Sequence, residues 1–169
     1  MSNVLRKSLL SIALIAPVLS GCGGGSSERE PVAVFSLSAT SPTDHAGKLS
    51  LTDANLVSTE LRQADDFLLD AYCLVRYANL RHDDGRTYSI AVAFRATDQR
   101  VMTIAVNHAQ SGWLVAAVYP DASLALIDRA RRTVTLRGVH STQGAQVGWQ
   151  LTIDGEAGFP AAPGTAACG

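Results

Sequence analysis

Residues 87–95 read Thr-Tyr-Ser-Ile-Ala-Val-Ala-Phe-Arg, and bulky and small side chains alternate along them without interruption. Successive side chains of a strand point to opposite faces of its sheet, so this period of two predicts a strand with one bulky, buried face. The other face carries threonine, serine and alanine, which let a neighbouring segment or a ligand approach closely. Packing by residues 53–69 is the simpler of these two explanations.

Strand signals continue on both sides of this segment. Residues 81–85, Arg-His-Asp-Asp-Gly, end in the Asp-Gly pair that is typical of hairpin turns, and they connect back to a predicted strand at 71–80. Further strands are predicted at 32–39, 48–52, 100–107, 113–119, 123–128, 133–139 and 147–154. Their short connections favour an antiparallel meander in which sequence neighbours are spatial neighbours. We therefore expect a mainly β fold, either a β-sandwich or a small up-and-down barrel.

Residues 53–69 fit two interpretations. Apolar residues recur there at helical spacing, and Asp53 is a suitable N-cap residue, which together indicate a short helix. The pairs Ser58-Thr59 and Asp65-Asp66 are weak helix formers and favour an irregular crossover instead. The sequence leaves both open.

Length and composition restrict the class of protein. A chain of 169 residues has room for one domain of ordinary size, and 47% hydrophobic against 17% charged residues excludes an extended disordered protein. With 14 Lys+Arg and 15 Asp+Glu, the net charge is −1. A nucleic-acid partner is not expected, because such proteins carry a basic domain or stripe.

The beginning of the chain has the pattern of an export signal. Arg6 and Lys7 precede an apolar stretch at 8–19. This stretch is too short to cross a bilayer comfortably, which takes about 20 residues, but it suits the apolar region of a signal peptide. Residues 1–21 are therefore predicted to be a signal peptide, which plays no part in the fold.

The signal ends in Leu-Ser-Gly-Cys at 19–22, which resembles the lipobox of bacterial lipoproteins. The resemblance covers only the first 22 residues. It implies cleavage before Cys22, a diacylglycerol group on the sulfur of Cys22, and acylation, for example with palmitate, of the new amino terminus. Gly23, not aspartate, follows the cysteine, and this implies sorting to the outer membrane in a host with two membranes. Residues 22–31, rich in glycine and serine, then form a flexible tether, and 32–169 form a single β-rich domain.

Two cysteines remain once Cys22 is assigned to lipidation. In an oxidising compartment an even number of cysteines indicates a disulfide, so Cys73 and Cys168 are predicted to pair. The bond would staple the C-terminal tail to a strand. The alternative is two unpaired thiols.

No motif in the chain indicates catalysis, a cofactor or a metal. The four histidines lie in or beside predicted turns, where exposed histidines are ordinary, and none has a metal-ligand spacing: His45, His82, His108 and His140. Ser111 lacks the Gly-x-Ser-x-Gly setting of a nucleophile elbow. We therefore predict no catalytic, cofactor-binding or metal-binding residues, and a protein that is not an enzyme.

Two functions fit these observations best. One is a membrane-anchored interaction module of the cell envelope that binds a protein or a glycan. The alternative is a carrier that holds a small apolar ligand inside a barrel. An enzyme assembled from residues on different loops is a weaker third. Arg129, Arg131 and Arg132, the one basic cluster, would form a solvated hairpin tip or contact lipid headgroups, an acidic glycan or a partner's carboxylates.

Overall fold

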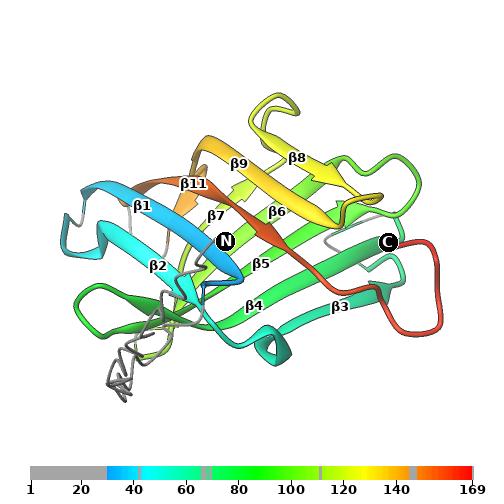
Figure 1. Ribbon diagram of the computed structural model, residues 1–169. Helices are drawn as coiled ribbons and strands as arrows, with labels where there is room; N and C mark the ends of the chain where they lie inside the picture. The colour runs from blue at the N-terminus through cyan, green and yellow to red at the C-terminus, as the bar shows by residue number, and fades with distance from the viewer. Residues whose placement is uncertain are drawn as a thin grey trace, which may run out of the picture.

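The computed structural model describes residues 30–41, 43–65, 68, 70–110, 112–144 and 148–168. In this part of the chain one antiparallel sheet curls into a half-barrel, so the prediction of a mainly β, antiparallel fold is confirmed (Figure 1). Its strands are β1 Ala33–Ser41, β2 Gly47–Leu51, β3 Val57–Arg62, β4 Tyr72–His82, β5 Thr87–Arg95, β6 Val101–His108, β7 Gly112–Val118, β8 Ala125–Asp128, β9 Thr133–His140, β10 Gln143–Gly144 and β11 Gln150–Gly158. Two short 3-10 turns, η1 Thr43–His45 and η2 Ala54–Leu56, accompany them. No helix among the described residues is long and apolar enough to cross a membrane.

The order of the strands is only partly a meander. Strands β4 to β7 are consecutive neighbours, as predicted. The expectation is wrong for β8, which pairs with β9 and lies at the opposite end of the strand order from β7. The terminal strands β1 and β11 run side by side in the middle of the sheet. After β9 the chain passes from β11 to β7. The N–H of Ser141 still donates to the carbonyl of Leu151 on β11, whereas that of Thr142 donates to the carbonyl of Ala116 on β7. Strand β10 then pairs with β7.

The predicted helix or irregular crossover at 53–69 is instead mostly a strand. Asp53 does act as an N-cap, because its side chain accepts a hydrogen bond from Asn55 N, but the turn it starts, η2, ends at Leu56. Strand β3 follows at once and pairs along β4 from Val57↔Tyr77 to Arg62↔Tyr72. Pairing with the edge of β4 outweighs the helical spacing of the apolar residues, because local propensity is weak beside tertiary contacts.

The bulky face of β5 points into the half-barrel, as its alternation predicted. Tyr88, Ile90, Val92 and Phe94 are at most 1% exposed. On the neighbouring strand β4, Tyr77 pairs with Ile90, and its side chain reaches across the interior. Its ring lies edge-on to Phe35 at 5.2 Å between centroids. Its hydroxyl donates to the carbonyl of Ala157 on β11 over 3.4 Å, so one side chain ties two walls of the half-barrel together.

The small-residue face of β5 lies on the outside of the half-barrel. Ala93 is buried there in a second apolar cluster with Leu68, Tyr72 and Met102. Asp65 holds this segment in place, because its carboxylate accepts from Leu68 N at 2.6 Å and from the Tyr72 hydroxyl at 2.9 Å. The small side chain of Ala93 is therefore explained by close packing of Leu68, which belongs to residues 53–69, as the simpler of the two explanations predicted.

Strand β11 can lie against β1 only because residue 155 is glycine. Gly155 sits where the β9–β11 register shifts and has a φ of +150°. A Cβ atom there would lie 2.7 Å from Phe35 Cδ1 and 2.9 Å from Phe35 Cα, and would also collide with the Val34 carbonyl. A methyl group must therefore push β1 and β11 apart.

We expect Gly155→Ala to lower the free energy of unfolding by about 3 kcal/mol, from overpacking and backbone strain together. Urea denaturation measures this. Gly158→Ala on the same strand is the control, because the nearest atom to a Cβ there is the Arg132 carbonyl at 3.9 Å. Equal stability loss in the two variants would contradict this account of β11.

Candidate functional site

The structure bears on the predicted site residues in two ways. Cys22 lies outside the described residues. Cys73 and Cys168 form the predicted disulfide, with an S–S distance of 2.08 Å and 5.5 Å between Cα atoms. The tail that follows β11 is thus bonded to Cys73, the second residue of β4. Phe159 and Ala162 are buried along the way, and the Phe159 ring packs on Phe94 at 6.1 Å between centroids.

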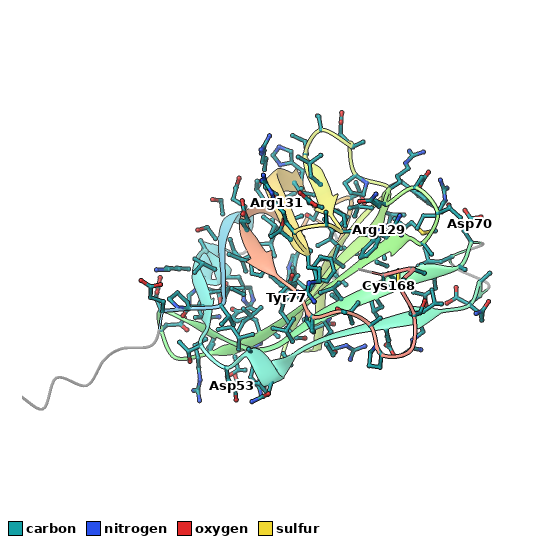
Figure 2. All side chains as sticks on the ribbon, turned by 45° about the vertical axis from the view of Figure 1, so that its right-hand side comes forward. Asp53, Asp70, Tyr77, Arg129, Arg131 and Cys168 are labelled. Carbon is teal, nitrogen blue, oxygen red and sulfur yellow. A yellow bond between two sulfur atoms is a disulfide. The ribbon has the colours of Figure 1, made fainter. Side chains whose placement is uncertain are left out.

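The basic cluster divides into residues with separate tasks. Arg129 Nη1 donates to the carbonyls of Ala167, at 2.6 Å, and Ala96, at 3.0 Å. Arg129 therefore holds the tail beside the disulfide, and Figure 2 shows it next to Cys168. Arg131 is mostly exposed and lies 3.8 Å from the carboxylate of Asp128. Within the basic cluster, Arg129 thus stabilises the position of the tail, whereas Arg131 lies in a solvent-exposed turn.

Three of the four histidines are buried together, and the prediction that they are exposed is wrong for these three. His45 follows β1, His82 ends β4 and His108 ends β6, and each is less than 8% exposed. Tyr88 is their common neighbour. Its ring centroid lies 5.9 Å from that of His45, 5.6 Å from His82 and 4.9 Å from His108. We call these four residues the histidine cluster.

His45 is held in its neutral form by its neighbours. Its Nδ1 lies 2.7 Å from the Tyr88 hydroxyl and 3.4 Å from Arg86 Nη1. Arginine only donates, so Nδ1 must accept and the proton must sit on Nε2. Burial lowers the pKa of His45 below its ordinary value of 6.5; Arg86, His108 and His82 act in the same direction, whereas Asp44 opposes them. The half-buried ring of Trp149 covers the site, 5.8 Å from His45.

His82 connects the cluster to the loops around it. Its Nε2 lies 3.1 Å from the Ala46 carbonyl and its Nδ1 2.7 Å from Asp84 Oδ1. The same carboxyl group bonds to Arg86, and this holds the pKa of Asp84 far below its usual range. Arg86 also donates to the carbonyl of Asp44. Only glycine fits at Gly47, where a Cβ would lie 2.8 Å from His82 Cε1.

This cluster closes one end of the half-barrel and has no metal-site geometry. Among the described residues no group of three or more His, Cys, Asp or Glu side chains could hold a metal ion. Its members lie in the packed interior, and their contacts hold residues 43–46 beside residues 83–86. The alternation of the strands contained a signal for it: His82 lies two residues after buried Leu80, and His108 two after buried Val106. Both therefore continue the inward face.

A different place offers room for a ligand. Strands β3 and β2 pair with successive parts of the same edge of β4, at 72–77 and 81–82, and they separate between these two stretches. A surface cavity of about 420 Å³ lies at this fork. It is lined by Ser50, Leu51, Thr52, Asp53, Leu56, Asn79, Arg81 and Thr87. We call it the fork cavity.

Two features of β4 shape the fork cavity. Asn79 has a φ of +56°, a left-handed conformation, at the point where the β4–β5 register shifts. Arg81 is exposed and, within the described residues, has no ion pair or side-chain hydrogen bond. A guanidinium without a carboxylate partner in a polar cavity is available to an anion from outside. Sequence reasoning missed this site because β2 and β3 were not predicted to share an edge of β4.

No family model, curated protein or solved structure matches this chain.

We expect His45 to make the folded state less stable as the pH falls. A histidine whose folded pKa is lowered favours the fold fully above its unfolded value, and this contribution is lost below about pH 6.5. Urea unfolding from about pH 7.5 to about pH 5.5 should show the loss for the parent protein and a smaller loss for His45→Gln.

The matched control is His140→Gln. His140 is exposed and bonds to the Thr152 hydroxyl at 2.8 Å, outside the histidine cluster. This variant should keep the pH dependence of the parent. If His45→Gln and the parent lose stability equally on acidification, the assignment of a buried neutral His45 is wrong.

Proposed function

We propose that this chain is a lipid-anchored protein of the bacterial cell envelope, located in the outer membrane, whose β domain is an interaction module rather than an enzyme. The lipobox-like residues 19–22 support the anchor, with Cys22 as the lipidated residue. Because a single acyl chain gives only marginal binding, the multiple chains of a processed lipoprotein make attachment stable. The Cys73–Cys168 disulfide supports an oxidising compartment outside the cytoplasm.

The packing of the interior favours an interaction module over a carrier of apolar ligands. The side chains that point into the half-barrel are large and fully buried, among them Tyr77, Phe35, Phe94 and Ile104. A carrier needs an internal space of ligand size, whereas these rings and aliphatic groups occupy the space between the walls. A partner or ligand would thus meet the outer surface. This packed interior is the observation on which the choice between the two functions rests.

The outer surface offers polar and apolar features for such contacts. Tyr119 and Leu126 are 46% and 39% exposed, and Arg100 lies over the Tyr119 ring at 5.9 Å. The fork cavity lies elsewhere on the outer surface, beside β2 and β4. Exposed aromatic and arginine side chains are enriched in protein interfaces. An envelope protein or a glycan is therefore the class of partner that we propose.

Crosslinking in the native cell, followed by membrane fractionation and mass spectrometry, tests this proposal. The parent protein should sediment with membranes and carry a crosslinked envelope component. Cys22→Ser should move the protein from the membrane to the soluble fraction, because it removes the sulfur that the lipid requires. The folded domain should be unaffected, since residue 22 belongs to the proposed tether.

The control is Ser26→Ala, which changes the tether and keeps Cys22. It should fractionate like the parent. Continued membrane association of Cys22→Ser would contradict the anchor, and a parent protein that crosslinks to nothing would contradict the interaction module.

A further inference from the structure

We propose that the fork cavity is a binding site for a carboxylate-bearing sugar, such as a uronic acid unit of an envelope glycan. The inference rests on the proposed function, and it names the ligand class that the module would recognise. Its evidence is the chemistry of the cavity lining, which combines an unpaired arginine, several neutral hydrogen-bonding groups and a small apolar surface.

Arg81 provides the charge for the carboxylate. Arg81 is exposed and lines the cavity, and among the described residues its guanidinium pairs with no carboxylate. Arg86 pairs with Asp84, and Arg95 with Asp70 and Asp98. Other arginines also lack a carboxylate partner among the described residues, but Arg81 is the arginine that lines this cavity. A planar guanidinium binds a carboxylate through two parallel hydrogen bonds, which fixes both position and orientation.

The remaining polar groups suit the hydroxyls of a sugar. Ser50, Thr52 and Thr87 contribute hydroxyl groups and Asn79 an amide, all of which both donate and accept. Leu56, which is only partly buried, provides apolar surface for the C–H face of a ring. A volume of about 420 Å³ is at the lower end of the range for small-molecule sites, which fits one or two sugar units.

Asp53 narrows the ligand class further. One of its carboxylate oxygens, Oδ1, is occupied by Asn55 N at 2.9 Å. The carboxylate can still accept a hydrogen bond from a sugar hydroxyl, whereas it repels further negative charge on a ligand. A lining with one arginine and one aspartate thus fits a ligand with a single negative charge and several hydroxyls better than a phosphate dianion.

Nuclear magnetic resonance titration of the full chain in detergent micelles tests the proposal. D-glucuronic acid should shift the backbone amide signals of Asn79, Arg81 and Thr87 in a saturable way, and D-glucose should do so far more weakly. Arg81→Gln should weaken glucuronic acid binding about tenfold or more, because it removes a charge-assisted bidentate contact. Arg81→Lys should fall between the two.

The control variant is Arg76→Gln. Arg76 is exposed on the same strand, and it is not part of the cavity lining, so binding should be unchanged.

The absence of a saturable shift with millimolar glucuronic acid would overturn the proposal. Equal weakening of binding by Arg81→Gln and Arg76→Gln would overturn it as well. Inorganic phosphate binding as tightly as glucuronic acid would overturn the sugar class. Membrane release of Cys22→Ser and crosslinking of the parent do not depend on these outcomes, so failure of this site is distinguishable from failure of the interaction module.

Discussion

The disulfide between Cys73 and Cys168 is the constraint on which one whole end of the domain depends. It joins residues 95 apart in sequence and fixes the last described residue to the start of β4. Between β11 and this bond the tail has no regular structure, yet it buries Phe159 and Ala162 against the core. A segment without strand pairing has few backbone hydrogen bonds to hold it. The disulfide therefore holds the tail against the core in place of strand pairing. The hydrogen bond from Arg129 to the Ala167 carbonyl supports it.

The two ends of the half-barrel are closed by different chemistry. The tail and its disulfide close the end where β4 and β6 begin (Figure 1). At the other end, His45, His82 and His108 surround Tyr88, and Arg86 and Asp84 tie the surrounding loops together. Between them the interior is filled by side chains such as Tyr77, which connects β4 to β11. Because side chains fill both ends and the middle of the half-barrel, we propose that a partner binds the outside of the sheet.

Much of this fold was predictable because the strands that carry it alternate strictly. Residues 87–95 gave β5 and its inward face, and the even cysteine count gave the disulfide. The position of β8 was not predictable, because nothing local in residues 125–128 distinguishes β7 from β9 as a partner. Strand β3 was missed because its apolar residues also fit a helix. It forms a strand because it pairs with the edge of β4, and this contact is not visible in the local sequence.

The candidate site was less predictable than the fold. Asn79 belongs to the predicted strand at 71–80 and Arg81 begins the predicted hairpin loop at 81–85. The cavity they line arises from two strands that share one edge, which is a long-range property. The histidine cluster likewise unites residues far apart in the sequence, such as His45 and Tyr88, which are 43 positions apart. Alternation could have placed His82 and His108 on the inner face, but no local pattern indicates that His45 meets them.

Urea unfolding of the oxidised protein, compared with the reduced and alkylated protein, tests most directly whether the stapled tail is part of the core. Closing a loop of 95 residues is worth roughly 4–5 kcal/mol when the crosslink is unstrained. We expect reduction to lower the free energy of unfolding by about this amount and to expose Phe159, while the strands keep their circular dichroism below the transition. An unchanged unfolding midpoint after complete reduction would show that the half-barrel holds its tail without the bond, and would contradict the structural role of the disulfide.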